Sequence, residues 1–491
     1  MLHTPLAQVI QSLGKRERSE LQRWVASPFI NRRPEVLQLC QYLCDQIPIG
    51  ENQGVETIPL SKVETYAQVL GALPAVKQRT VSKSKGKLTH EKLSQSEDAA
   101  LRYTMSFLFS AVKQWMAYRE WSKDGTTTGL QLCRALRKKG LMTVFEKEFK
   151  ILQSPDPNTQ QSTDFHLAQY QLQLEHWESK HQSGQADRIQ LQQMCGSFGA
   201  FVAVSALRHG CAALDKSGGG LPFETVDFLP EALAKVEAGQ YIEVPTVQVY
   251  YYCFRLMQVN SEPDFQQLKS LLTAHSAIFP PEEIRDVWLV AINYCIRRLN
   301  AGERDWVREA FELYRSGLER DLLLDNGKMP KATYQNIMLL AIASDAWDWA
   351  RQFLEDYRPS LAIGERYNAY QFNLALWHFR RKAYPEAQEI LRSVEFRDVH
   401  YNLDARRMML RMYYDEGAIS ALDSLLHSFR TYLLRHRNLG YHRELNANFV
   451  RAVQQMLRLS PGDAQARDQL RQKIIREKYL AEREWLLGVL G

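Results

Sequence analysis

Apolar residues recur at helical spacing along most of the chain after residue 98. Between Ala99 and Trp121 they crowd one broad face, at Leu101, Met105, Leu108, Phe109, Val112, Trp115 and Met116. Beyond Gly125, segments of helical length alternate with short breaks that contain Pro or Gly, such as Pro280-Pro281. No convincing run of alternating polar and apolar residues lies between these breaks. The pattern therefore predicts an all-α protein.

Residues 1–121 are predicted to form an N-terminal helical region. Within residues 1–46, two short helices flank a turn, and a further short helix is expected from Ser61 to Leu70. Residues 77–98 contain almost no large apolar side chains and carry many lysines, so we expect a flexible basic loop there.

A repeat signal lies in residues 125–462. Aromatic, small and apolar positions recur together at a separation of 37 residues, in the pairs Trp347 and Tyr384, Ala350 and Ala387, and Leu354 and Leu391. The period drifts upstream, because the separation between Ala310 and Ala350 exceeds that between Ala350 and Ala387. Small residues at such positions allow two helices to cross closely. This spacing predicts a degenerate solenoid of the tetratricopeptide type, a right-handed array of antiparallel helical hairpins, with residues 463–491 as a C-terminal capping helix.

Several segments, taken in order along the chain, resemble an uncharacterised family of helical-repeat proteins common in Bacteroidota. They are Ser27-Pro28-Phe29-Ile30-Asn31, Asn293-Tyr294-Cys295-Ile296, Tyr401-Asn402-Leu403-Asp404-Ala405-Arg406 with Tyr413-Tyr414, Ser424-Leu425-Leu426-His427-Ser428-Phe429-Arg430, and Trp485-Leu486-Leu487. The first segment departs from the family pattern at Ile30, where a second aromatic residue is usual. The resemblance implies a tetratricopeptide-like fold and no established activity.

Composition narrows the class of protein. At 491 residues the chain exceeds one ordinary domain, and its 45% hydrophobic content suits a large folded core. Its seven cysteines are odd in number and scattered through apolar segments, as expected for reduced thiols. The N-terminus lacks the pattern of a signal peptide, and no apolar run approaches the length needed to cross a bilayer. We therefore expect a cytoplasmic protein that does not associate with membranes.

Motifs for catalysis or metal binding are not evident in the sequence. Neither phosphate-binding glycine motif occurs, and Gly218-Gly219-Gly220 before Pro222 is interpreted as a flexible loop. Cys40 and Cys44 share a helical face but lack a partner pair, so we interpret them as core thiols rather than zinc ligands. We accordingly expect no enzyme activity, cofactor or metal, although a catalytic triad assembled in space needs no linear motif.

Two features suggest partners. Arg406, Arg407 and Arg411 cluster near Tyr413 and Tyr414, and Arg and Tyr are favoured at binding hot spots. We treat these five residues as a candidate partner-binding site, with repeat packing as the alternative role for the aromatics. The first hypothesis is a non-catalytic scaffold that binds an unknown protein or peptide on a concave helical surface.

A second hypothesis is a nucleic-acid-associated protein. The net charge of +6 is mild for this length, but residues 77–92 carry six lysine and arginine residues against one glutamate. Such a segment attracts phosphate, and the Arg-rich C-terminal helices add to it. No aromatic residue that could stack on a base lies within the segment, so a solvated loop is the favoured interpretation.

Overall fold

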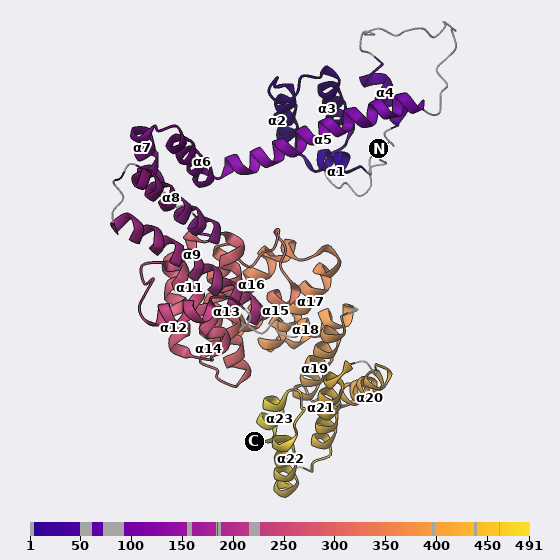
Figure 1. Cartoon of the computed structure of the whole chain (residues 1–491). Helices are drawn as coiled ribbons and strands as arrows, with labels where there is room; N and C mark the ends of the chain where they lie inside the picture. Colours follow the sequence, from indigo (N-terminus) through magenta and orange to yellow (C-terminus); the bar gives the residue numbers. More distant parts are fainter. Residues whose placement is uncertain are drawn as a thin grey trace, which may run out of the picture. The chain divides into compact units, whose positions relative to one another are not determined.

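The computed structural model is helical throughout the part of the chain that it describes (Figure 1). That part comprises residues 4–49, 61–71, 93–154, 160–182, 184, 188–215, 226–394, 398–436, 439–460 and 462–491. No strand occurs in these ranges, where the only β-type pairing is one isolated bridge between Asp325 and Lys328. The prediction of an all-α protein is confirmed. The basic segment 77–92 and the glycine run 218–220 lie outside the described residues.

The chain divides into two compact units, Met1–Pro155 with Leu167–Cys195, and Asp156–His166 with Gly196–Gly491. The helices that begin in residues 1–182 are α1 (Pro5–Ser12), α2 (Lys15–Ala26), α3 (Pro34–Gln46), α4 (Lys62–Val69), α5 (Gln95–Lys123), α6 (Gly125–Lys138), α7 (Met142–Gln153) and α8 (Thr163–Gln182). Where two helices were expected in residues 1–46, three form, because the chain breaks at Leu13-Gly14.

Buried Arg18 holds α1, α2 and α3 together. Its guanidinium donates to the carbonyl oxygens of Ile10 at 2.9 Å and Ile47 at 2.6 Å, and also bonds those of Leu13 and Cys44. These acceptors lie at or just beyond the C-terminal ends of α1 and α3, where helix carbonyls lack intrahelical partners. One arginine therefore completes the hydrogen bonding of two helix ends and becomes part of the core.

The predicted basic loop ends earlier than we expected. Ser94 caps α5, and Ser94 and Glu97 form a reciprocal capping box in which the amide of Ser94 donates to Glu97 at 2.9 Å. Residues 95–98 are consequently helical, and Asp98 pairs with Lys62 of α4 at 2.9 Å. The sequence interpretation of these residues as loop failed because it relied on missing apolar side chains, whereas a polar capping box starts this helix.

The remaining described helices lie in the second part of the chain. They are α9 (Arg188–Asp215), α10 (Leu229–Glu237), α11 (Pro245–Gln258), α12 (Glu262–His275), α13 (Pro281–Asn300), α14 (Trp306–Glu319), α15 (Lys331–Ala343), α16 (Trp347–Asp356), α17 (Ile363–Arg380), α18 (Tyr384–Ser393), α19 (Val399–Asp415), α20 (Ile419–Arg435), α21 (Tyr441–Leu457), α22 (Ala464–Arg476) and α23 (Arg483–Leu490), with short 3₁₀ helices η2 (Ser276–Ile278) and η3 (Arg358–Ser360). Pro245 and Pro281 begin α11 and α13, a position where the missing amide hydrogen costs nothing.

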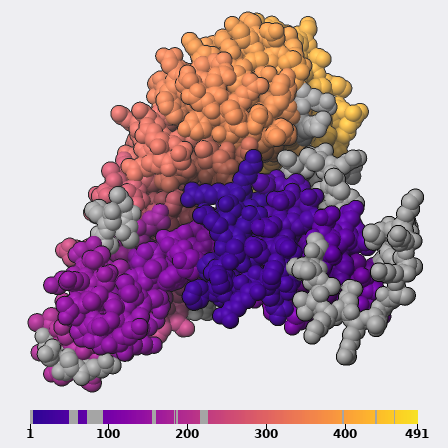
Figure 2. Space-filling model, turned by 90° about the horizontal axis from the view of Figure 1, so that it is seen from above, coloured from indigo at the N-terminus to yellow at the C-terminus, as the bar shows by residue number. Residues whose placement is uncertain are grey.

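Helices α11 to α18 pack as consecutive pairs. The first helices of neighbouring pairs contact one another in two cases, α11 with α13 and α15 with α17, whereas the pair α13–α14 packs on the next pair through α14 and α15. Their side chains form one continuous hydrophobic core that extends from α9 to α19. In the space-filling view, the atoms of the orange segment that contains α15 to α18 form one continuous packed surface (Figure 2).

The 37-residue repeat found in the sequence corresponds to equivalent structural positions. Trp347 and Tyr384 are the first residues of α16 and α18, which are both ten residues long. Ala350 and Ala387 are completely buried one turn later, as close helix crossing requires. The three residue pairs thus mark the second helix of two successive helix pairs.

Three turns between paired helices share one geometry that the sequence did not reveal. Each turn contains one residue with left-handed backbone dihedrals. It is Asp345 (φ 58°) between α15 and α16, Lys382 (φ 60°) between α17 and α18, and Gly417 (φ 68°) between α19 and α20. In each turn the following amide donates to a carbonyl five residues earlier, at 2.9–3.0 Å. This hydrogen bond satisfies a carbonyl at the end of the first helix and sets the reversal of the chain. The same hydrogen bond follows left-handed Gly140 in the α6–α7 turn, at 3.0 Å, and left-handed Gly302 in the α13–α14 turn, at 3.2 Å. Asp345 and Lys382 hide two copies of this turn in the sequence because neither is Gly.

The C-terminal segment differs from the single capping helix that we predicted. It forms α22 and α23, separated at residues 477–482, and Glu482 adopts a left-handed conformation with φ 54°. These helices share a second hydrophobic core with α20 and α21. Helix α19 contributes to both cores, because Met412 packs in the first and Leu410 in the second.

Helix α9 is the one described helix that is long and apolar enough to cross a bilayer by length and composition. An 18-residue window within Arg188–Leu214 has a mean hydropathy of 1.3, and 33% of that window is buried. Gly210 of α9 lies so close to Leu229 and Phe254 that an added Cβ would clash with them. Core helices pass the same test of length and composition, so this single helix does not identify a membrane protein.

Candidate functional site

A pocket of about 370 Å³ lies between α9, α11 and α13. Each helix contributes residues at spacings of three, four or seven, which share one helical face. Its lining comprises Arg208, Cys211 and Ala212 of α9, Tyr250, Cys253 and Met257 of α11, and Glu283, Asp286, Val287, Leu289, Val290 and Asn293 of α13. Pockets of this size accommodate small molecules or individual peptide side chains.

A polar network connects the three helices at one side of this pocket. Glu283 accepts a hydrogen bond from the Tyr250 hydroxyl at 2.6 Å and pairs with Arg208 at 3.3 Å. Burial raises the pKa of Tyr250 far above its usual range, and the hydrogen bond to the Glu283 carboxylate raises it further. Tyr250 therefore remains a neutral donor at physiological pH, and the network orients Arg208 at the pocket.

The start of α8 extends this network. Arg208 donates to the Thr163 hydroxyl at 3.3 Å, and buried His166 lies 2.7 Å from the Thr246 hydroxyl of α11. Burial lowers the pKa of His166 to about 4, so its ring is neutral near pH 7. Neutral imidazole can form this bond as donor or acceptor, depending on its tautomer. The contact attaches the first turn of α8 to α11.

Apolar and sulfur-containing side chains also line the pocket. Met257, Leu289 and Val290 are half-buried there, and the Cys211 thiol lies 3.6 Å from the Tyr250 carbonyl oxygen. A hydrogen bond with Cys253 and burial both raise the pKa of Cys211. A thiol with a raised pKa is a poor nucleophile because the thiolate is the reactive form. The pocket thus combines an apolar wall with oriented polar groups, an arrangement suited to binding.

The five predicted partner-binding residues lie on α19, but they point in different directions. Arg406 donates to Asn402 at 2.8 Å and lies over the ring of Tyr432 of α20, 4.7 Å from its centroid. Tyr413 is buried, and its hydroxyl accepts from Arg392 of α18 at 3.0 Å. Tyr414 packs edge to face against Trp485 of α23. Each side chain contacts a neighbouring helix, as the repeat-packing alternative supposes for the aromatics.

Arg407 and Arg411 share a face of α19, as their spacing predicts, but this face is not lined by solvent. Both side chains are 18% exposed and pair with Glu482, Arg407 at 3.2 Å and Arg411 at 2.8 Å. Arg407 also donates to buried Asn446 at 3.1 Å. Their shared acceptor Glu482 lies far along the chain, in the turn between α22 and α23, so no local pattern could indicate it. A binding role for the five residues stays a prediction.

The pocket between α9, α11 and α13 was missed in the sequence. Tyr250 and Asn293 lie in segments that stood out for other reasons, the tyrosine triplet and one of the family-like motifs. Arg208 and Glu283 carried no signal, because they are far apart in the chain and each is an ordinary charged residue on a helix. Only the packing of the three helices brings them together.

Metal ligation has no candidate cluster in the described ranges, where no group of three or more His, Cys, Asp or Glu side chains is suitably arranged. Cys40 and Cys44 are buried in the core of α1 to α5, as expected for core thiols. All seven cysteines are free thiols.

Comparisons of the chain with protein-family models, curated proteins and solved structures gave no significant match. The resemblance to helical-repeat proteins of Bacteroidota therefore stays a prediction.

Proposed function

We propose that this protein is a non-catalytic scaffold that binds a protein or peptide partner, with the pocket between α9, α11 and α13 as one contact site. The observation that carries the proposal is the composition of this pocket. Arg208 and Tyr250 are held by Glu283, while Leu289 and Val290 provide an adjoining apolar wall. Binding sites typically combine an apolar surface with a few oriented polar groups.

The architecture in this proposal is a degenerate, right-handed solenoid of tetratricopeptide-like hairpins, in a cytoplasmic member of the Bacteroidota family named above. The paired helices and the recurring left-handed turns support it. In such arrays, the stacked hairpins create an extended concave surface that binds partners. The pocket lies between α11 and α13, the first helices of two successive pairs, and α9. The seven free cysteines suit a reducing compartment.

Photo-crosslinking tests this proposal directly. A photoreactive benzoylphenylalanine replaces Asn293, which is exposed at the pocket, or Gln266, which is exposed on α12 outside it. Irradiation in the native host, followed by mass spectrometry, identifies attached proteins. We expect a specific protein adduct from position 293 and none from position 266.

A pocket-filling variant provides the control. Val290→Trp places a large side chain at the half-buried pocket wall and should abolish the adduct from position 293, while the melting temperature is measured to verify folding. The same adducts from both positions, or an adduct that Val290→Trp leaves unchanged, would argue against this pocket as a partner site. An adduct with nucleic acid instead of protein would favour the alternative of a nucleic-acid-associated protein.

A further inference from the structure

A second surface lies in the C-terminal helices, between α20 and α21. A groove of about 220 Å³ has an apolar floor formed by Leu433 and Val450, and Leu434 stands beside them with 55% of its surface exposed. Large aliphatic side chains at this exposure gain free energy when a partner covers them. The groove thus offers apolar area that the described part of the chain leaves uncovered.

Three arginines line the same groove. Arg430 and Arg451 are exposed and Arg443 is half-buried, and none of them forms an ion pair with a carboxylate in the described part of the chain. By contrast, Arg407 and Arg411 on α19 are both paired with Glu482. Residues 419–476 contain ten Arg and Lys against four Asp and Glu, an excess equal to the net charge of the whole chain. The groove consequently lies in the basic part of the protein.

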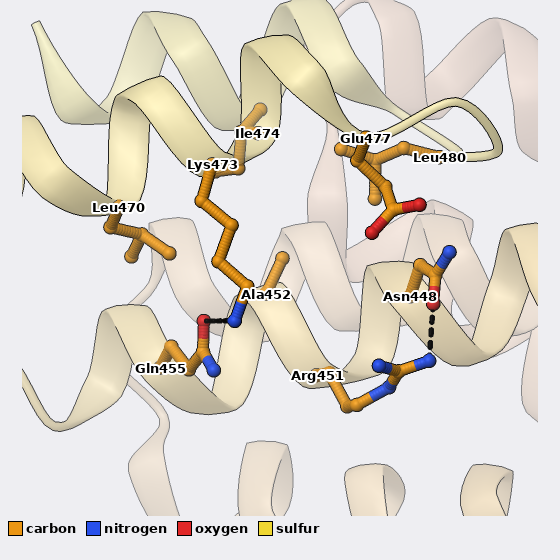
Figure 3. Close-up of a pocket in the computed structure, with 9 residues that line it drawn as sticks. All are labelled: Asn448, Arg451, Ala452, Gln455, Leu470, Lys473, Ile474, Glu477 and Leu480. Atoms are coloured by element: carbon orange, nitrogen blue, oxygen red, sulfur yellow. Dashed lines mark hydrogen bonds between the residues drawn. The ribbon is translucent and has the colours of Figure 1, made fainter.

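The side of α21 that faces α22 provides an internal comparison, because hydrogen bonds within the chain hold several of its polar groups. Figure 3 shows that Lys473 of α22 bonds Gln455. It also shows that Arg451, which lines both this cavity and the groove, donates to Asn448. The cavity there is only about 30 Å³, and Leu470 and Ile474 of α22 close it. Helix α22 thus covers one side of α21, and no equivalent described helix covers the groove on the α20 side.

We propose that the groove between α20 and α21 binds an acidic, amphipathic helical segment of a partner protein. The groove residues on α21 extend from Arg443 to Gln454, about 16 Å of helix, which matches about three turns of a bound helix. Apolar side chains of that segment would cover exposed Leu434, beside the buried floor residues Leu433 and Val450. Its carboxylates would pair with Arg430 and Arg443, whose planar guanidinium groups favour bidentate binding. The surface is separate from the pocket between α9, α11 and α13.

Nucleic acid fits the groove less well. Binding of single strands combines positive charge with aromatic side chains that stack on bases. The residues that line this groove are aliphatic, cationic or amide, and none is aromatic. The apolar floor therefore favours a protein segment over RNA or DNA.

The test uses a displayed library of random 16-residue peptides, selected on the full-length protein at physiological salt. We expect the enriched peptides to be acidic, with carboxylates and large apolar residues at helical spacing. The enriched peptides are then titrated against variants that replace exposed or half-buried side chains. Arg430→Ala with Arg443→Ala should weaken binding at least about tenfold, since two charge-assisted contacts are lost. Leu434→Ala should weaken it about threefold or more through lost apolar contact.

Arg435→Ala is the matched control, because Arg435 is exposed on α20 but does not line the groove. It should leave the affinity unchanged. The proposal is overturned if no acidic peptides are enriched. It is also overturned if the enriched peptides bind the double arginine variant and Leu434→Ala as tightly as they bind the parent. It is also overturned if a single-stranded RNA 20-mer binds the parent more tightly than the peptides do. Equal thermal melting of the variants verifies that each one is folded.

Discussion

Arg407 and Arg411 illustrate how an apparent surface cluster can serve the fold. Both guanidinium groups converge on Glu482, and the ring of Trp485 lies 5.5 Å from Arg411. From the sequence, their replacement was expected to have little effect on stability, provided that the face was lined by solvent. The structure reverses this expectation, because removing both arginines leaves a largely buried carboxylate without its partners.

We therefore expect Arg407→Ala with Arg411→Ala to lower the free energy of unfolding by about 2–4 kcal/mol. Urea denaturation followed by circular dichroism measures this change. Arg315→Ala is the control, because Arg315 forms an exposed ion pair with Glu319 on the same helix and should contribute less than about 1 kcal/mol. A double variant as stable as the parent would show that Glu482 does not depend on these arginines.

His166 predicts a pH dependence of stability. Burial lowers its pKa in the folded state from 6.5 to about 4, so on acidification the unfolded state takes up the proton first. The contribution of neutral His166 to the free energy of unfolding is fully present above about pH 6.5 and declines as the pH falls toward 4. We expect this residue to account for a loss of about 2 kcal/mol between pH 7.5 and pH 5.

The measurement compares urea denaturation of the parent and His166→Gln at both pH values. Glutamine can still bond Thr246 but does not titrate, so the variant should lose less stability on acidification. His436→Gln, at an exposed position, should retain the pH dependence of the parent. Parallel pH profiles for the parent and His166→Gln would show that His166 becomes protonated without cost.

At the scale of elements, the turns between paired helices are the recurring feature. A left-handed conformation costs a residue with a Cβ atom roughly 1 kcal/mol or more relative to Gly. Lys382 tolerates it because the surrounding hydrogen bonds determine the turn, whereas Gly417 adopts it without strain.

We expect Lys382→Gly to raise the free energy of unfolding by about 0.5–1 kcal/mol and Gly417→Ala to lower it by about 1 kcal/mol. Differential scanning fluorimetry shows the two changes as opposite shifts of the melting temperature. Gly364→Ala is the control. Gly364 lies in α17, has open space around it and does not adopt a left-handed conformation, so this substitution should not lower the melting temperature. A lower melting temperature for Lys382→Gly would mean that the lysine side chain stabilises the turn.

At the scale of the whole molecule, the two cores that meet at α19 determine how unfolding spreads. Deleting residues 464–491 removes α22 and α23 and leaves Phe449 and Val453 of α21 without part of their packing. Such damage remains local where helices do not belong to the disrupted core, because parts of a protein can open separately. We expect α20 and α21 to lose protection in hydrogen exchange, whereas α11 to α14 keep theirs.

Hydrogen exchange followed by mass spectrometry of peptides resolves these regions. An internal control is available, since α11 to α14 belong to the core that extends from α9 to α19 and not to the C-terminal core. Equal loss of protection across both regions would mean that the second part of the chain unfolds as one cooperative body.

The sequence by itself determined the helical class and much of the helix placement, including the 37-residue spacing between the starts of α16 and α18. These features depend on local apolar spacing and on prolines and glycines, which act within one or two helical turns. The start of α5 and the division of the C-terminal segment into two helices were missed, since a polar capping box and a left-handed Glu482 leave no apolar trace.

Only the tertiary structure decided which charged residues are paired and which surfaces are left uncovered. Glu482 meets Arg407, and Glu283 meets Arg208, and in both pairs the two residues come from distant parts of the chain. Like Arg407, Arg430 and Arg443 lie in the Arg-rich C-terminal helices. Neither of them pairs with a carboxylate within the described ranges. Ion pairing depends on distances of a few ångströms between side chains from separate helices, and helical periodicity specifies the face of a residue but not what that face meets.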